Sequence, residues 1–351
     1  MAGRLTISLG ALADNYQSLV AATRAEIACV VKANAYGAGI ETVVPRLIEE
    51  GVSRFFVASA LEASTLRVLS RDISIYVLEG PLRDSVGMLM GNHLIPVINS
   101  REQFELWDKE APYALHVDTG MERLGVTIDE IEKWMGEDLR PELLITHFAR
   151  ADEPGHDFSK QQLQRFHSVA DKLNVAVSIS NSAGIVLHEI DEDVARAGIA
   201  LYGASPSTKV ADALRPVTRL EGEVLQVRHA GANVPVGYGG TFTTSGDGLW
   251  LATIGVGYAD GLPRLLSNAG RVWINGHFYP VVGRVGMDLV HVGLSEGAAQ
   301  PPVQVGDYAE FIGTHIAVDE LARLAGTIGY EILTGLDAAR RLSRVVVEEY
   351  L

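Results

Sequence analysis

The stretch VVKANAYG, at positions 30–37, closes the apolar run Ile27–Val31 with a lysine, followed by small residues, a tyrosine and a glycine. Such a run is typical of a fully buried strand. Burying an ammonium group costs several kcal/mol unless the group is paired or neutralised. Lys32 therefore has two interpretations. It reaches solvent from a strand end, or it forms a Schiff base with an aldehyde, as catalytic lysines do.

Short apolar runs alternate with longer amphipathic segments from Leu5 to about Leu220. Strands alternating with helices indicate a parallel sheet, and eight such units match a (β/α)₈ barrel. A doubly wound sheet is the alternative, but no Gly-rich nucleotide-binding turn follows the first strand. The predicted strands are Glu26–Lys32, Arg54–Ala58, Ile73–Leu78, Leu94–Ile98, Tyr113–Val117, Leu143–His147, Val175–Ser180 and Val194–Ala200. The predicted helices include Ile40–Glu50, Ala60–Leu69, Arg101–Lys109, Asp129–Met135 and Ser159–Lys172.

Beyond about Leu220, glycine and β-branched residues dominate and the apolar periodicity falls to two. This pattern indicates a mostly antiparallel β-domain, so we predict a barrel domain at 1–225 and a C-terminal β-domain at 226–351. Asn275-Gly276 is a strong hairpin signal. Strands are predicted at Glu223–Arg228, Trp250–Val256, Arg271–Ile274, Phe278–Gly283, Asp288–Val292 and Tyr308–Ile312, and a helix at Ala317–Leu324.

Composition excludes several classes of function. The net charge of −15 argues against nucleic acid and anionic membranes as partners. The single cysteine, Cys29, permits neither an internal disulfide nor a cysteine zinc site, and we predict no metal. No apolar segment is long enough to span a bilayer, and no signal-peptide core follows the N-terminus. We expect a cytoplasmic protein.

Reactive side chains follow the predicted strands, at the end where barrels place their active sites. Singly, each has an ordinary interpretation, such as a core histidine or a turn asparagine. Their shared placement favours an active site. The residues are Lys32 at the first strand, Asp118 and Arg123 after the fifth, His147 at the sixth, Asn181 and Ser182 after the seventh, and Arg196 to Ile199 in the eighth.

A Schiff-base lysine suggests pyridoxal phosphate, whose phosphate needs amide and hydroxyl donors. Ser182, the amides of Gly198 and Ile199, and Tyr36 are candidate donors. Arg196 would bond the pyridine nitrogen and keep it unprotonated, because an arginine is permanently cationic. An unprotonated ring is a poorer electron sink, which suppresses transamination and favours return of the proton to the same carbon.

Racemisation then requires acid/base groups on opposite faces of a planar intermediate. Lys32 is one such group, and Tyr258, in the segment GYADG at 257–261, is a candidate for the other. Arg123 and the Met287 backbone are candidates for the substrate carboxylate and the ring hydroxyl.

Seven segments together resemble the bacterial alanine racemases, in the family's order and nearly end to end. The first of them is specific on its own. They are VKANAYG at 31–37, DTGMERLG at 118–125, THFA at 146–149, NSA at 181–183, RAGIALYG at 196–203, GYADG at 257–261 and GRVGMD at 283–288.

The resemblance implies a fold-type III pyridoxal 5'-phosphate enzyme that interconverts L-alanine and D-alanine by a two-base mechanism on the cofactor's aldimine. D-Alanine is a peptidoglycan precursor. The resemblance also implies a head-to-tail homodimer with shared active sites, in which Lys32 and the partner's Tyr258 are the bases. The implied cofactor-binding residues are Lys32, Tyr36, Arg123, His147, Ser182, Arg196, Gly198, Ile199 and Tyr330. Arg123 and the partner's Met287 would bind the substrate, and Asn181 and Asp288 would support the site.

Two positions depart from the family pattern. His116 stands where several relatives carry a carbamylated lysine that orients the arginine, and a histidine is not carbamylated in that way. A bound anion in its place is one hypothesis. Gly286 replaces a frequent cysteine. The alternative functions are a racemase of another small amino acid, such as serine, or a non-catalytic pyridoxal phosphate-binding barrel.

Overall fold

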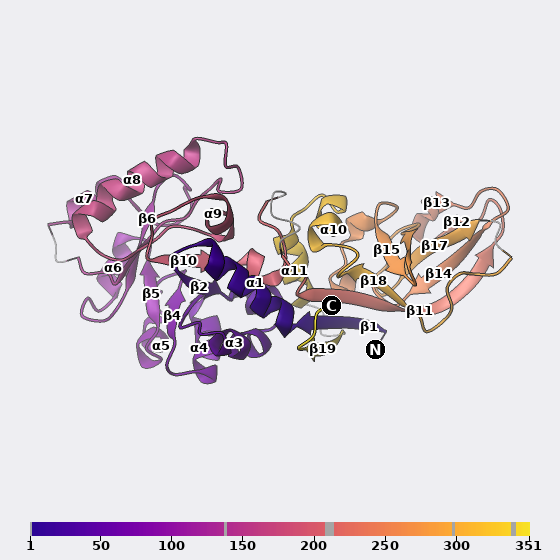
Figure 1. The fold of residues 1–351 in the computed structure, drawn as a ribbon, viewed down its shortest axis with the longest axis horizontal. Helices are drawn as coiled ribbons and strands as arrows, with labels where there is room; N and C mark the ends of the chain where they lie inside the picture. Colours follow the sequence, from indigo (N-terminus) through magenta and orange to yellow (C-terminus); the bar gives the residue numbers. More distant parts are fainter. Residues whose placement is uncertain (1, 137–138, 208–213, 297–298, 338–341) are drawn as a thin grey trace.

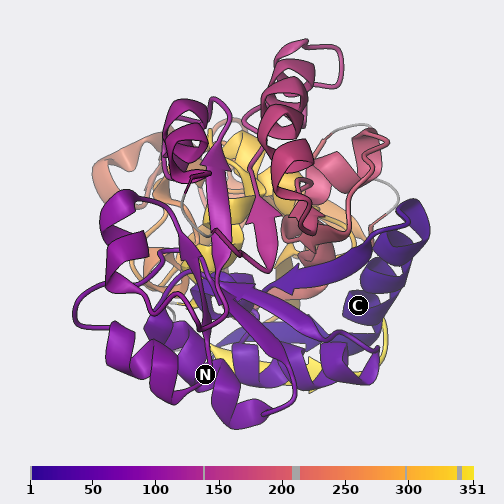
Figure 2. The ribbon, with the colours of Figure 1, turned by 90° about the vertical axis from the view of Figure 1, so that its left-hand side faces the viewer.

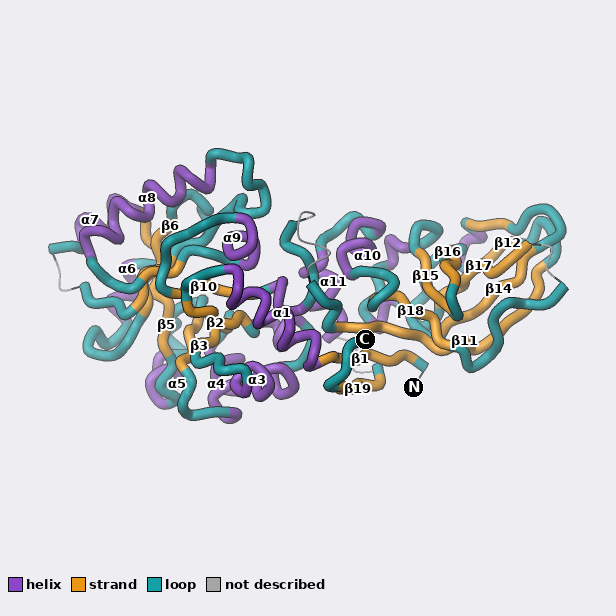
Figure 3. The backbone as a smooth tube through the Cα atoms, viewed as in Figure 1, coloured by secondary structure: helices purple, strands orange, loops and turns teal. Residues whose placement is uncertain are grey.

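The protein forms two lobes joined into an elongated molecule, in a computed structural model that describes residues 2–136, 139–207, 214–296, 299–337 and 342–351 (Figure 1). The helix-covered lobe carries the earlier part of the chain. Figure 3 shows that the other lobe, which carries the later part, consists mainly of strands.

The first lobe is a nearly closed parallel barrel, as predicted. Its strands run in the order β10-β2-β3-β4-β5-β6-β8-β9. Asp193 N donates to Val177 O at 3.1 Å and Arg196 N to Ser180 O at 3.0 Å, and these bonds join the two ends of the sheet. The strands are β2 (Glu26–Val30), β3 (Arg54–Val57), β4 (Ser74–Val77), β5 (Ile95–Ile98), β6 (Ala114–Asp118), β8 (Leu143–Ile145), β9 (Val177–Ser178) and β10 (Val194–Ala197), with the short β7 (Val126–Thr127) beside β6.

Helices surround these strands, as Figure 2 shows from the barrel side. Sequence signals set several of their starts: Ser59 with Glu62, and Thr127 with Glu130, form capping boxes. The five predicted helices are confirmed, and each of their ends agrees within three residues. The helices are α1 (Leu9–Ala22), α3 (Ile40–Glu49), α4 (Ala60–Leu69), α5 (Val86–Gly91), α6 (Arg101–Leu106), α7 (Ile128–Trp134), α8 (Phe158–Leu173) and α9 (Ser182–Leu187), followed by the 3₁₀ turn η1 (Ile199–Tyr202) after β10.

The second lobe is built on a mostly antiparallel sheet in the order β16-β15-β18-β11-β1-β19, with β14 and β17 joined through β11. Its strand β1 comes from the start of the chain and pairs antiparallel with β11 and parallel with β19. The sheet strands are β1 (Gly3–Ser8), β11 (Thr218–Ala230), β14 (Leu249–Ile254), β15 (Arg271–Ile274), β16 (His277–Pro280), β17 (Val290–Glu296), β18 (Tyr308–Ile312) and β19 (Ser343–Val347). The predicted division at residue 225 remains a prediction, but residues 3–8 pair within this second sheet.

Shorter elements complete this lobe. The predicted Asn275-Gly276 hairpin is confirmed: Ile274 pairs with His277, and the φ angles of 47° and 94° are those of a tight hairpin turn. The predicted helix at 317–324 is α10 (Val318–Leu324). Besides β1 and β19, the elements of this lobe that the sequence pattern did not predict are β12 (Pro235–Val236), β13 (Phe242–Thr243), α11 (Gly329–Asp337) and the 3₁₀ turns η3 (Tyr238–Gly240), η4 (Tyr258–Asp260) and η5 (Arg264–Leu266).

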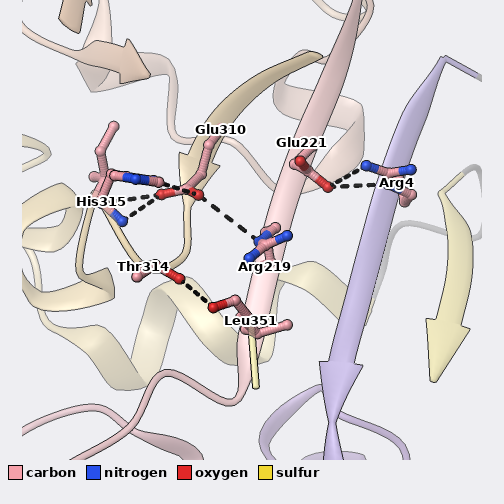
Figure 4. Close-up of polar contacts among 8 residues, drawn as sticks. Arg4, Arg219, Glu221, Glu310, Thr314, His315 and Leu351 are labelled. Atoms are coloured by element: carbon pink, nitrogen blue, oxygen red, sulfur yellow. Dashed lines mark hydrogen bonds and ion pairs between the residues drawn. The ribbon is translucent and has the colours of Figure 1, made fainter. Parts of the chain in front are cut away.

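A buried carboxylate holds part of this sheet together. Glu310 on β18 accepts from the amides of His315 and Ile316 at 2.7 and 3.2 Å, and Arg219 of β11 lies 3.8 Å away (Figure 4). The carboxylate is therefore satisfied by hydrogen bonds, as a buried charge requires. Next to it, Arg4 pairs with Glu221 at 2.8 Å, which ties β1 to β11.

The barrel core follows from the apolar runs in its strands. Phe55, Phe56 and Val57 on β3 are fully buried, because a strand in a covered parallel sheet has no solvent face. Within the described residues, no helix has the length and apolarity needed to cross a membrane.

Candidate active site

A cavity of about 460 Å³ opens at the carboxyl ends of the barrel strands. It brings together ten of the predicted site residues. They are Lys32, Tyr36, Arg123, His147, Asn181, Ser182, Arg196, Gly198, Ile199 and Tyr330. Tyr330 comes from α11 in the second lobe, and its ring lies 6.2 Å from that of Tyr36. Both lobes of one chain thus build this cavity.

Lys32 begins a turn of left-handed helix, α2 (Lys32–Tyr36). The φ angles of Ala33, Asn34, Ala35 and Tyr36 lie between 51° and 55°. Each such residue costs about 1–2 kcal/mol relative to a right-handed turn, so other contacts have to hold the segment. The predicted strand Glu26–Lys32 accordingly ends earlier, at Val30, because the chain turns at Val31.

Two side chains hold this left-handed turn. Glu62, in the first turn of α4, accepts from Ala33 N at 2.7 Å and from Ala58 N at 2.8 Å. Asn34 Oδ1 accepts from Ile40 N at 2.8 Å, which closes the loop onto α3. The turn that presents Lys32 therefore depends on a carboxylate from the next β/α unit.

Lys32 lies in an environment that favours its neutral form. Burial lowers its pKa, and the charges of Arg123 and Arg196 lower it further, while Glu62 opposes them. Among the described residues that line the cavity, three side chains are cationic and only Glu79 is acidic. At neutral pH, a larger fraction of such a lysine is unprotonated than of a solvated lysine, and the unprotonated amine is the form that acts as nucleophile or base.

One end of the cavity has the donors that a phosphate needs. Ser182 Oγ accepts from Gly198 N at 2.9 Å and from Ala200 N at 3.3 Å, which leaves its own hydrogen to donate. A Cβ on Gly198 would lie 2.7 Å from Tyr36 Oη, so a larger residue here would push the phenol away from this backbone. These donors and the excess of cations fit a phosphorylated cofactor such as pyridoxal phosphate.

Arg196 is held firmly at the base of the cavity. It donates to Ser178 Oγ and Thr146 O, both at 2.6 Å. Burial lowers its pKa to about 10, so it keeps its charge near neutrality. Its Nη2 lies 3.4 Å from His147 Nδ1, which must accept because a guanidinium only donates. Burial and Arg196 keep the pKa of His147 well below its usual value, so this ring is neutral.

Arg123 lies on the loop after β6, and Asp118 shapes that loop. The Asp118 carboxylate accepts from the amides of Gly120 and Met121 at 2.8 and 2.9 Å. Asp118 is thereby occupied with the backbone, while Arg123 projects from an exposed position to the cavity.

Tyr258, Met287 and Asp288 lie outside this cavity. Tyr258 is 43% exposed and Met287 is 52% exposed. The two segments are joined by hydrogen bonds, from Tyr258 N to Gly286 O at 3.0 Å and from Ala259 N to Met287 O at 2.9 Å. That these residues act in the active site of a partner chain remains a prediction.

Sequence reasoning did not single out Glu62 or Glu79, which follow β3 and β4 and support the cavity rim. The capping box formed by Ser59 and Glu62 was a readable signal for the helix start. It does not indicate that the same carboxylate reaches Ala33.

The barrel, the buried lysine at a strand end and the phosphate-type donors define a pyridoxal phosphate-dependent barrel enzyme with a second, β-rich domain. The family models for the alanine racemase N-terminal and C-terminal domains match residues 7–206 and 217–346. The chain belongs to the alanine racemase family. The predictions of this family and of its cofactor are thereby confirmed.

Relatives and solved structures agree with this assignment. The alanine racemase of Rhodospirillum rubrum is 41% identical, over 95% of this chain and 93% of its own. The biosynthetic alanine racemase of Agrobacterium fabrum is 40% identical, over 95% and 91%. The crystal structure of the Bartonella henselae alanine racemase, with covalently bound pyridoxal phosphate, superposes with a TM-score of 0.92 at 35% identity, over 99% of this chain and 100% of that one.

Proposed function

We propose that this protein interconverts L-alanine and D-alanine with bound pyridoxal phosphate, in active sites that take residues from two chains. One observation carries the proposal. Ten predicted groups converge on the cavity around Lys32, while Tyr258 and Met287 lie together on an exposed face of the same chain.

When bound, pyridoxal phosphate supplies the electron sink that acidifies the α-hydrogen of an amino acid. Ser182, Tyr36, Gly198, Ile199 and Tyr330 would hold its phosphate. Lys32 would bind it covalently and, once released, take or return the α-proton at its Nζ. The lowered pKa of Lys32 suits this work near neutral pH.

Arg196 and Arg123 would have separate tasks. Arg196 is fixed by three protein acceptors and would donate to the pyridine nitrogen. Arg123 would bind the substrate carboxylate, assisted by the partner's Met287. His147, neutral and hydrogen-bonded to Arg196, would add a donor toward the cofactor. Asn181 caps α9 by accepting from Gly184 N at 3.0 Å and thereby supports Ser182.

The second base would be the partner's Tyr258, moving the α-proton at its Oη on the face opposite Lys32. A head-to-tail homodimer would bring it there, with the partner's Asp288 as support. An apolar surface supports such a dimer. Its members are Tyr238, Tyr258, Leu265, Met287 and Leu289, each at least 40% exposed in the single chain.

Mixing two variants, each lacking one of the two proposed bases, tests whether the active site is shared between chains. Lys32→Ala and Tyr258→Phe proteins are each prepared, mixed at equal amounts under conditions that exchange subunits, and assayed for D-alanine. If each site joins Lys32 of one chain to Tyr258 of the other, half the dimers have one intact site, giving about a quarter of the unmodified activity. A mixture no more active than its parents would exclude the shared site. Absence of D-alanine formation by the unmodified, cofactor-loaded protein would exclude the function itself.

Serine is the second candidate substrate. Tyr330 at the cavity and the partner's Tyr258 would narrow the entrance, which favours a small side chain. Rates with L-alanine, L-serine and larger amino acids decide between them. We further propose that the enzyme works in the cytoplasm and supplies D-alanine for peptidoglycan. Its two domains would divide at 1–225 and 226–351, except that β1 and the start of β11 pair within the sheet of the second domain.

A further inference from the structure

His116 occupies an unusual place in the cavity. It lies on β6, is only 8% exposed, and lines the cavity together with Arg123 and Arg196. Its Nδ1 lies 2.8 Å from Oδ1 of Asn99, which follows the neighbouring strand β5. Its other ring nitrogen, Nε2, has no hydrogen bond to any residue in the described part of the chain.

The side-chain orientation of Asn99 determines the tautomer of His116. Asn99 Nδ2 donates to Val97 O at 2.8 Å and to Leu78 O at 3.0 Å. An Asn99 flipped by 180° would place its oxygen against both carbonyl oxygens. Oδ1 therefore points at His116, and His116 Nδ1 must carry the hydrogen.

A third residue secures Asn99. Gln103 Oε1 accepts from the backbone N–H of Asn99 at 2.8 Å. Gln103 Nε2 donates to the backbone oxygen of Glu79 at 2.7 Å. Because the hydrogen of His116 is on Nδ1, where it is donated to Asn99, the other ring nitrogen, Nε2, carries a lone pair. Burial and the charges of Arg196 and Arg123 lower the pKa of His116 to about 4, although Asp118 opposes them, so this lone pair persists at neutral pH.

The lone pair on His116 Nε2 needs a hydrogen-bond donor, and the cavity that His116 lines offers Arg123, Arg196 and Lys32. The guanidinium of Arg196 is already bonded to Ser178 Oγ and Thr146 O. Arg123 has no hydrogen bond or ion pair to a residue that the structure describes, and it is close enough to lower the pKa of His116. Lys32 has the separate task of binding the cofactor.

We propose that His116, locked by Asn99 as the Nδ1–H tautomer, is a positioning residue whose Nε2 accepts from Arg123 and turns that guanidinium toward the substrate carboxylate. The inference rests on the proposed function of Arg123. It is an alternative to a bound anion, because a lone pair repels an anion and attracts a guanidinium.

The tautomer is measurable without any activity. Nitrogen-15 spectra of protein with labelled histidine, with cofactor bound, report which nitrogen of each ring is protonated, and His116→Gln identifies the signal. We expect one ring that stays neutral and Nδ1-protonated from pH 8 to 5. A proton on Nε2, or a charged ring at pH 7, would overturn the proposal.

Kinetics test the positioning role. His116→Leu removes the acceptor, and we expect the KM for alanine to rise about tenfold with kcat much less affected. His116→Gln keeps a neutral acceptor and should recover most of that loss, whereas the exposed control His277→Gln should match the unmodified enzyme. An equal KM rise in the Gln and Leu variants, or none in either, would overturn the proposal.

Changing the salt anion tests the alternative of an anion bound beside Arg123. At constant ionic strength, the KM for alanine should be the same in chloride as in gluconate. A KM that is lower in chloride than in gluconate would overturn the proposal. An inactive unmodified enzyme would instead exclude the proposed function, and the nitrogen-15 spectra would still test the tautomer.

Discussion

The two lobes differ in how far they bury their chemically important residues. In the barrel lobe, Lys32, His116, His147 and Arg196 are crowded in a cavity, and burial lowers the pKa of each. In the β-lobe, Tyr258 is 43% exposed beside Met287.

This difference in exposure is what the proposed shared active site would explain. The barrel cavity is complete as a site for binding an anionic cofactor, because its donors and cations converge on one volume. Tyr258 offers a reactive phenol that lies outside the barrel cavity, beside the exposed apolar side chain of Met287. Joining the two surfaces from different chains would supply both halves.

The largest expected effect comes from removing the cavity's lysine. Lys32→Ala should abolish the near-visible band of the covalently bound cofactor and lower racemisation by about 10³-fold or more, because both attachment and one base are lost. Absorbance spectra and D-alanine formation measure this. Lys160→Ala, at an exposed lysine of α8, is the control. A persistent covalent band in Lys32→Ala would show that another residue binds the cofactor.

The next effect concerns the exposed face. Tyr258→Phe should slow racemisation by about 10²–10⁴-fold, because only the phenol oxygen is removed. Exchange of the α-hydrogen with solvent deuterium, followed by NMR, should fall first for one enantiomer. Tyr308→Phe, in the same lobe, serves as the control. Equal losses for both enantiomers would argue against separate bases on the two faces.

The third prediction concerns the pH dependence of stability, to which the buried His116 of the barrel lobe contributes. The pKa of His116 is about 4 in the folded protein, against about 6.5 for an ordinary histidine. The unfolded chain therefore binds the extra proton, and stability should fall as the pH drops from 6.5 to 4, by about 3 kcal/mol from this residue. Urea unfolding across that range should show a shallower fall for His116→Gln than for the exposed control His277→Gln. Identical slopes would show that His116 does not contribute.

The smallest effect concerns the turn that carries Lys32. Glu62→Gln keeps one acceptor but weakens the bonds to Ala33 N and Ala58 N, which should cost about 1–3 kcal/mol of stability. Thermal unfolding and cofactor titration measure the loss. Glu105→Gln, at an exposed residue paired with Arg101, should cost less than about 0.5 kcal/mol. Weaker cofactor binding in Glu105→Gln than in Glu62→Gln would contradict the special role of Glu62.

Most of the barrel was predictable, because apolar runs and amphipathic segments are local signals. All eight predicted barrel strands are present, and α4 has the predicted bounds. The sequence did not indicate strand β1 or its place in the second lobe. Its six residues pair with β11 and β19, more than 200 positions away, and no local pattern specifies that pairing. The sequence did not indicate helix α11, which carries Tyr330 to the cavity, because Gly329, Thr334 and Gly335 weaken its helical pattern.

Local sequence specifies which chemical groups stand at the strand ends, including Lys32, because residue type and strand periodicity are properties of neighbouring residues. How those groups are held depends on contacts between distant parts of the fold. The left-handed turn after Val31 depends on Glu62, which lies 29 positions from Ala33, and the tautomer of His116 depends on Asn99, 17 positions away. Protonation, orientation and exposure are set by contacts across the fold, and so the same sequence pattern leaves them open.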